Sequence, residues 1–426
     1  MFEVEEIVVK NGKVEYNYST SKELSKFFSK NKLYIKSEVD FSEVPIEILT
    51  IPLLGNILPI SWFAGFDIKV EKLDKEFYVA ANKLKQQFSE YYPIINTKKS
   101  ELIVNEIVDA KYETTNKTAM LFSGGVDVYT TFFRHYEEKP DLITIKGADI
   151  DVHDHKQWEN VENYNTTTEA IKPNKKFSLE INLREFITFE VDKLMDGLGW
   201  WGKIQHGLGL TTACAPLSYV NMYNVVYIAS SYTRKENYDF ILWGSMPEID
   251  NLISWGLTKI KHDASELTRQ EKINEIIYKS KEIKNKPELR VCYNEFKSGL
   301  NCNKCEKCCR TIFAIMIMNE PPNKYGFDID VSIFDYLNKI MKKRFTSEGN
   351  RLFWVEIYNQ SLESDKYFNS HIPEWNKKYK DFIMNLENNI NQGVHCISKR
   401  NKIKLDIVNK CPKLFNLYLK VRKSLL

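Results

Sequence analysis

The stretch Met120-Leu121-Phe122-Ser123-Gly124-Gly125-Val126-Asp127 decides the predicted fold. Its apolar start predicts a buried strand, and a helical pattern begins directly after the two glycines. Glycines at such a turn let the backbone bend tightly and let a phosphate approach the main-chain N–H groups with no side chain in the way. The first turn of the helix adds N–H groups and the positive end of the helix dipole. The stretch is therefore suited to binding phosphate, and Asp127 could hold magnesium.

Strands and helices alternate on both sides of this turn, from residue 118 to about residue 319. Strand-like apolar runs lie at residues 119–122, 142–145, 177–181, 225–229 and 289–293. Helical patterns lie at residues 128–136 and 208–222. This alternation implies parallel crossovers and predicts an α/β fold with a doubly wound parallel sheet. Ligands of such sheets bind at the carboxyl ends of the strands, where the glycine turn lies.

Two further regions flank this central domain, which we place at residues 113–320. Residues 1–112 begin with strand-like pieces and carry helical patterns at 22–28 and 73–91, which predicts a small N-terminal α+β region. Residues 321–426 are charged and have aromatic residues at helical spacing. They predict a helical C-terminal region whose aromatic side chains form its core.

The composition is typical of a soluble globular protein. The chain has 426 residues, of which 43% are hydrophobic and 27% charged, and its net charge is +3, so a nucleic acid is not expected as a partner. No run of about 20 apolar residues could span a bilayer, so no membrane partner is expected either. The N-terminus is acidic where a signal peptide would be basic, which predicts a cytoplasmic protein.

Five of the eight cysteines fall between Cys292 and Cys309. In a cytoplasmic chain, such clustering indicates a metal site rather than disulfides. Cys302, Cys305 and Cys308 recur every three residues, and Cys292 lies ten residues before the first of them. Four thiolates satisfy tetrahedral zinc, so the spacing predicts a Zn2+ knuckle. An iron–sulfur cluster also uses four thiolates and stays an alternative, as does Cys309 in place of Cys308.

The glycine turn resembles the Ser-Gly-Gly-x-Asp-Ser signature of the PP-loop ATP pyrophosphatases, in the residues Ser123, Gly124, Gly125, Val126 and Asp127. The resemblance implies a PP-loop (HUP-like) fold that binds ATP with Mg2+. It also implies cleavage between the α and β phosphates, with an acid or amide oxygen activated as its adenylate. The turn matches neither a Walker loop nor a dinucleotide-binding loop.

The chain departs from this signature at Val128, where the family has serine. A hydroxyl contact to phosphate is then lost, or it is supplied by Thr130 or Thr131. This departure concerns the detailed geometry of the loop.

The cysteine pattern narrows the resemblance. Cys-Tyr at 292–293 and Cys-x-x-Cys-x-x-Cys at 302–308, near the end of such a domain, resemble the 7-cyano-7-deazaguanine synthase (QueC) family. The resemblance implies adenylation of 7-carboxy-7-deazaguanine, a small carboxylate, followed by reaction with ammonia. The chain is about twice as long as the plain synthases and so resembles a QueC-like branch with members in bacterial antiviral systems. In that branch the activated acid could pass to a protein amine. The sequence also leaves open whether the chain forms a homodimer.

Four residues outside the glycine turn are further candidates. The loop after the second strand helps to hold the nucleotide in the family, which implies binding roles for Gly147 and Asp149. Lys203 opens a helix and could hold the departing pyrophosphate, where charge develops in the transition state. Arg269, near another helix start, could also reach phosphate. With Asp127, the residues Lys203 and Arg269 form the candidate catalytic set.

Two other functions remain alternatives. In the first, a PP-loop enzyme adenylates a different carboxylate or a tRNA base. In the second, signalled by Val128, a degenerate domain binds nucleotide or a partner protein without turnover.

Overall fold

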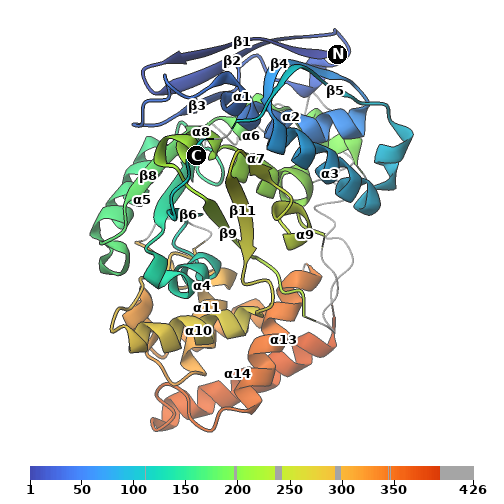
Figure 1. The fold of residues 1–426 in the computed structure, drawn as a ribbon. Helices are drawn as coiled ribbons and strands as arrows, with labels where there is room; N and C mark the ends of the chain where they lie inside the picture. The colour runs from blue at the N-terminus through green and yellow to red at the C-terminus, as the bar shows by residue number, and fades with distance from the viewer. Residues whose placement is uncertain are drawn as a thin grey trace.

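The structure is a computed structural model, and it describes residues 1–110, 112–195, 199–235, 242–292, 299–343, 345 and 347–393. Residues 394–426 of the predicted C-terminal region and Tyr293 of the Cys-Tyr pair lie outside this described part. The fold is α/β, as predicted, with one mostly parallel sheet of eleven strands and fourteen α-helices in the described residues (Figure 1).

The sheet has the strand order β10-β11-β9-β6-β7-β8-β3-β2-β1-β4-β5. The strands are β1 (Phe2–Lys10), β2 (Lys13–Thr20), β3 (Tyr34–Lys36), β4 (Ile68–Asp74), β5 (Leu102–Val108), β6 (Thr118–Leu121), β7 (Asp141–Lys146), β8 (Lys176–Ile181), β9 (Val225–Ala229), β10 (Ser254–Trp255) and β11 (Thr258–Asp263). The five strands β8-β7-β6-β9-β11 of the central domain are parallel to one another. Counted along the central domain they follow the order 3-2-1-4-5, so the winding reverses between β6 and β9.

The helices of the described residues are α1 (Ile46–Leu49), α2 (Ile51–Ala64), α3 (Lys75–Tyr91), α4 (Val126–Arg134), α5 (His155–Thr167), α6 (Leu183–Phe186), α7 (His206–Thr212), α8 (Ala215–Asn221), α9 (Pro247–Asp250), α10 (Arg269–Glu282), α11 (Glu306–Met316), α12 (Ile333–Met341), α13 (Glu348–Leu362) and α14 (Pro373–Asn391). Helix α2 is apolar all round and almost wholly buried, which is typical of a core helix. Among the described residues, no helix has the length and apolar character needed to cross a membrane.

Apolar side chains cover both faces of the central strands. Ala119 and Leu121 of β6 belong to a core with α2, α7 and α8, whereas Met120 and Phe122 belong to a core with α4, α10 and α11. Successive strand residues point to opposite faces, and a parallel sheet is covered by helices on both sides. This burial on both faces explains why the strand could be recognised as a continuous apolar run.

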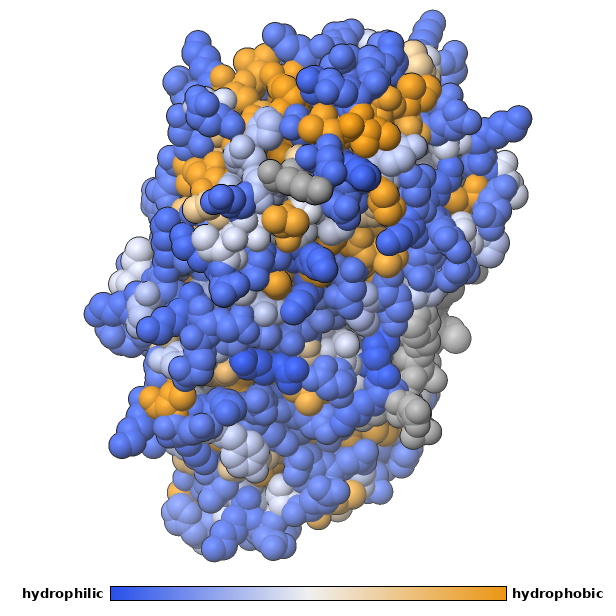
Figure 2. All heavy atoms as spheres, viewed as in Figure 1, coloured by the Kyte–Doolittle hydropathy of each residue, from blue (hydrophilic) through white to orange (hydrophobic). Residues whose placement is uncertain are grey.

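The N-terminal and C-terminal regions extend the two sides of this central unit. Strands β1 to β5 continue the same sheet beyond β8, through the antiparallel β3–β8 pair. Helices α12, α13 and α14 join the core that contains α10 and α11, at the opposite end of the molecule in Figure 1. Figure 2 shows hydrophobic side chains gathered over the N-terminal part of the viewed face, whereas the remainder of that face is largely hydrophilic.

Two predicted helices differ from the structure. The run 208–222 forms two helices, α7 and α8, because Pro216 in the first turn of α8 has no N–H to continue α7. The run 22–28 forms only the short 3-10 turn Ser25–Phe27.

The strand predicted at 289–293 is absent over its described residues 289–292. This segment instead crosses the glycine turn, where the N–H of Arg290 donates to the carbonyl of Gly124 at 2.7 Å. Because the N–H of Arg290 is used in this contact, it does not pair with a strand at the edge of the sheet. The segment therefore lies outside the sheet.

Candidate active site and metal centre

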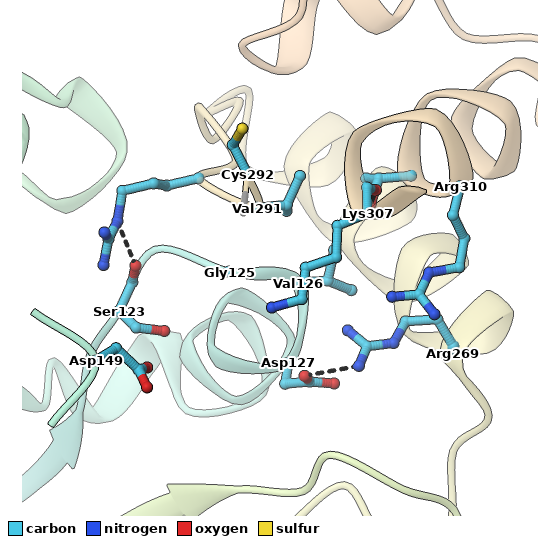
Figure 3. Close-up of a pocket in the computed structure, with 12 residues that line it drawn as sticks. Ser123, Gly125, Val126, Asp127, Asp149, Arg269, Val291, Cys292, Lys307 and Arg310 are labelled. Atoms are coloured by element: carbon cyan, nitrogen blue, oxygen red, sulfur yellow. Dashed lines mark hydrogen bonds and ion pairs between the residues drawn. The ribbon is translucent and has the colours of Figure 1, made fainter. Parts of the chain in front are cut away.

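A pocket lies at the carboxyl ends of the central strands, beside the point where the winding reverses. Its lining residues are Ser123, Gly125, Val126, Asp127, Asp149, Arg269, Arg290, Val291, Cys292, Lys307, Arg310 and Thr311. Four of these side chains are basic and two are carboxylates, so the lining favours an anionic ligand. Figure 3 shows Arg269, Lys307 and Arg310 on the side next to Asp127, with Ser123 and Asp149 across from them.

The two glycines of the turn have different roles. Gly124 has a φ of +76°, and a Cβ there would lie 2.8 Å from Tyr164, so both the backbone and the neighbouring ring require glycine. Gly125 has an ordinary negative φ and lines the pocket. An added Cβ at Gly125 would meet no atom closer than 3.7 Å. Gly124 therefore shapes the turn, whereas Gly125 leaves space on the pocket side.

Asp127, in the first turn of α4, is held by two cations. Its Oδ2 lies 2.9 Å from Nη2 of Arg269 (Figure 3), and its Oδ1 lies 3.2 Å from Nζ of Lys272. Burial alone would raise the pKa of Asp127, but the charges of Arg269 and Lys272 outweigh it and leave the pKa below its ordinary value. The carboxylate is therefore ionised at neutral pH.

Lys272 is a buried site residue that the sequence reasoning missed. Its side chain is 1% exposed, and its Nζ also donates to the carbonyl of Ser230, at the end of β9. Burial lowers the pKa of Lys272, while the charge of Asp127 opposes the shift. The lysine thus ties the glycine turn to the end of β9 across the point where the winding reverses.

A capping box fixes the first turn of α10, which carries Arg269 and Lys272. The Thr268 hydroxyl accepts a hydrogen bond from the N–H of Glu271, and the Glu271 carboxylate accepts one from the N–H of Thr268. The Thr-x-x-Glu pattern at 268–271 was the sequence signal that could have located this helix start and its two basic residues.

Three more basic side chains reach the pocket from the segments around the cysteines. The Nε of Arg290 donates to the carbonyl of Ser123 at 2.8 Å. Lys307 and Arg310 lie in the first turns of α11. Burial, and then the neighbouring charge of Arg269, lower the pKa of Lys307. Arg290 and Lys307 were missed, although both flank the cysteine motif closely in sequence.

The four predicted cysteines form a cluster that could hold a metal ion such as zinc. The sulfurs of Cys292, Cys302, Cys305 and Cys308 all lie within 4.8 Å of one another, with separations of 3.4 Å for Cys305–Cys308 and 3.9 Å for Cys292–Cys305 and Cys302–Cys308. A tetrahedral site with metal–sulfur bonds of about 2.3 Å places its sulfurs about 3.8 Å apart. Cys309 is directed instead toward the carbonyl of Asn303.

Main-chain N–H groups also point at the cluster. The N–H of Cys302 donates to the sulfur of Cys292, and the N–H of Cys305 donates to the sulfur of Cys302, each at 3.3 Å. Such hydrogen bonds help to orient the sulfurs that would bind a metal. Cys292 also lines the pocket, so the cluster and the basic side chains beside it form one structural unit with the glycine turn.

Two sequence candidates lie apart from the residues that line the pocket. Gly147 has a φ of +101°, and a Cβ there would lie 1.8 Å from the carbonyl of Ile181, so it is a glycine that the turn requires. Lys203 lies in the π-helical turn Trp201–Gln205, and its carbonyl accepts a hydrogen bond from Tyr92. Asp149, by contrast, lines the pocket on the same side as Ser123 (Figure 3).

Of the two alternatives for the family's serine, loss of the hydroxyl or its supply by Thr130 or Thr131, the second has neither threonine at the pocket. Thr130 donates to the carbonyl of Val126 within α4, and Thr131 is buried; neither lines the pocket. Thr311 from α11 brings a hydroxyl to the lining, and that hydroxyl donates to the carbonyl of Lys307.

No protein-family model matches the chain, and no match was found among curated proteins or solved structures. A function for this chain therefore rests on the geometry of the pocket and on the motifs in its sequence.

Proposed function

We propose that this chain is a QueC-like PP-loop enzyme that adenylates a carboxylate with ATP, releases pyrophosphate and passes the acyl group to a nitrogen nucleophile. The observation that carries the proposal is the convergence of four basic side chains on a Ser-Gly-Gly turn at the reversal point of the sheet. Both the turn and its position are suited to a phosphate chain. By resemblance, the acid is 7-carboxy-7-deazaguanine.

The pocket fits the triphosphate of ATP in two respects. Gly125 leaves open space beside the first turn of α4, and the first N–H groups of a helix have no partner within the helix and can bind a ligand. In addition, the buried Nε of Arg269 has no hydrogen-bond partner among the described residues. A buried donor without a partner is costly in a folded protein, and a phosphate oxygen would satisfy it.

Two carboxylates are the candidate ligands for the Mg2+ that accompanies ATP. Asp149 lines the pocket next to Ser123 (Figure 3), and Asp127 lies at the start of α4. Each oxygen of Asp127 already contacts a cation, Arg269 or Lys272. A magnesium role for Asp127 therefore requires the phosphates to draw these cations away, whereas Asp149 has no ion pair with either of them.

The reaction that this pocket would support is a displacement at phosphorus. A carboxylate oxygen of the acid forms a bond to the α-phosphorus, and the bond from that phosphorus to the bridging oxygen breaks. The bridging oxygen leaves with its electron pair as part of pyrophosphate. Arg269, Lys307 and Arg310 would stabilise the charge that develops on this leaving group. A nitrogen nucleophile then attacks the acyl carbon, and AMP departs.

We assign the cysteine cluster to structural Zn2+. Four protein thiolates close a tetrahedral site and leave no position for a substrate, which is the arrangement of structural zinc. The metal would fix the segments that carry Arg290, Lys307 and Arg310 against the glycine turn. Metal analysis of the purified protein distinguishes zinc from the iron–sulfur alternative.

The nitrogen acceptor and the other partners follow only from the resemblance. Ammonia or a protein amine could resolve the adenylate, and a homodimer remains an arrangement to be tested by light scattering. We also propose a cytoplasmic location, where zinc thiolates are retained without competition from disulfides.

Product analysis tests the proposed function. Purified protein is incubated with Mg-ATP, 7-carboxy-7-deazaguanine and ammonium chloride, and the nucleotides are separated by anion exchange. AMP and pyrophosphate that form only with the acid would support the proposal. ADP and phosphate would contradict it, and tight ATP binding with no product from any acid would favour a degenerate binding module.

A further inference from the structure

Helix α13 of the C-terminal region contacts two arginines that line the pocket, Arg269 and Arg310. This helix packs beside α10 and α11, the two helices that carry Arg269 and Arg310 (Figure 1). We propose that Phe353 of α13 is a positioning residue for phosphate binding, which holds the Arg269 and Arg310 guanidinium groups together at the pocket wall. The proposal rests on the proposed function for the identity of the ligand as a phosphate chain.

Both guanidinium groups lie close to the same aromatic ring. The guanidinium carbon of Arg269 is 4.9 Å from the centroid of Phe353, and that of Arg310 is 4.3 Å from it. Two guanidinium groups brought together repel each other, and this repulsion grows as the surroundings exclude water. The ring attracts both cations through its quadrupole, most strongly when the ring is desolvated. Phe353 is 7% exposed, so this condition is met.

The ring of Phe353 is itself held by another aromatic side chain. Tyr232, which follows β9, stacks on it with centroids 5.7 Å apart and ring planes inclined by 6°. The ring is therefore fixed between α13 and the segment that leaves the end of β9. That segment also contains Ser230, whose carbonyl accepts the hydrogen bond from Lys272.

Two neighbours of Phe353 on α13 also contact the first turns of the helices that carry the two arginines. The carboxylate of Glu356 accepts a hydrogen bond from the N–H of Gln270, in the first turn of α10. The indole of Trp354 donates to Glu306 at 3.0 Å, and this glutamate lies 3.5 Å from Arg310. One turn of α13 thus contacts the starts of both helices that supply pocket arginines. A partner or movement that displaced α13 would change the phosphate site.

The function of Phe353 can be separated from simple space filling. Leucine at 353 keeps an apolar group of nearly the same reach but removes the aromatic face. We expect Phe353→Leu to weaken binding of inorganic pyrophosphate about ten-fold, because both cation–ring contacts are lost. Phe353→Trp keeps an aromatic face, and among tryptophan, tyrosine and phenylalanine the tryptophan ring attracts cations best. The affinity of this variant for pyrophosphate should stay within about three-fold of that of the unsubstituted protein.

Phe334→Leu is the matched control. Phe334 is a buried phenylalanine of α12 in the same C-terminal region, and its ring contact is with Trp375 rather than with a cation. Titration calorimetry of the full chain with pyrophosphate and magnesium measures the affinity of each variant, and thermal unfolding checks that each is folded.

The expected pattern is weak binding for Phe353→Leu alone. Equal affinity for Phe353→Leu and the unsubstituted protein would overturn the inference, as would a Phe353→Trp variant that binds as weakly as the leucine variant or an equal loss in Phe334→Leu. An unsubstituted protein that does not bind pyrophosphate would also overturn it. Because pyrophosphate binding needs no acid and no turnover, a protein that binds pyrophosphate but never forms AMP would contradict only the proposed function.

Discussion

Replacing Asp127 by asparagine tests the charge balance at the centre of the pocket. The substitution keeps the shape of the side chain but removes the negative charge that faces Arg269 and Lys272. Lys272 is buried, so it would be left with a charge and no carboxylate partner. Breaking a buried ion pair by removing one partner costs about 3–5 kcal/mol. We expect a loss near 3 kcal/mol, because the Asp127 side chain is 21% exposed and water screens part of the interaction.

A double-mutant cycle separates this effect from general damage. Lys272→Met removes the cation, and the double variant Asp127→Asn with Lys272→Met removes the cation and the carboxylate charge together. The free energy of unfolding of the double variant should be at least about 1 kcal/mol higher than the value expected if the two single losses simply added. Urea denaturation without ATP at pH 7 measures each free energy of unfolding, with a common slope as the check for comparable unfolding.

The result that would refute this reasoning is a small or additive effect. If Asp127→Asn costs less than about 1 kcal/mol, or if the two substitutions add, Asp127 does not balance a buried cation. In the folded variant, AMP formation should also fall by about 100-fold or more, because the pocket loses the carboxylate that aligns its cations.

Three further predictions concern the turn, the cysteines and pH. Gly125→Ala should change stability by less than about 1 kcal/mol, because its φ is ordinary and the methyl group meets no atom closer than 3.7 Å. The same variant should bind Mg-ATP at least about ten-fold more weakly in calorimetry, because the methyl group occupies pocket space; unchanged affinity would place the phosphates elsewhere. Cys305→Ser should lose its zinc by elemental analysis and lose at least about 3 kcal/mol of stability, whereas a metal-loaded, stable variant would contradict the assignment. Burial lowers the pKa of His135, but its contacts with the carboxylates of Asp263 and Glu138 outweigh burial and raise it. The stability that charged His135 contributes is therefore present below its unfolded pKa of about 6.5 and is lost as the pH rises through the higher folded value. His135→Gln should remove this part of the pH dependence of unfolding, and an unchanged curve would contradict it.

Local patterns predicted the parts of the molecule that local interactions determine. The strand of β6 could be recognised because both of its faces are buried, and the turn after it because Gly124 needs a positive φ. The four cysteines could be grouped by spacing because three of them lie within seven residues, and the structure places their sulfurs together. Pro216, which divides the predicted helix 208–222, is a local signal of the same kind, because a proline inside a helical run removes a main-chain N–H.

Tertiary packing determined what the sequence could not show. The joining of β3 to β8, which adds the N-terminal strands to the central sheet, is a pairing between segments far apart in the chain. Lys272 and Phe353 contact residues that line the pocket, Asp127 for the first and Arg269 and Arg310 for the second, because α10 and α13 pack against them. Lys203 had a suitable charge and a suitable helix start, but its turn lies apart from the pocket lining.

Exchange of labelled pyrophosphate into ATP tests the central claim most directly. The protein is incubated with ATP, magnesium and [32P]pyrophosphate, with and without 7-carboxy-7-deazaguanine and with no amine present. Reversible adenylation predicts that label enters ATP only when the acid is present, and that Asp127→Asn abolishes the exchange. Absence of acid-dependent exchange, together with release of ADP from ATP, would contradict the account.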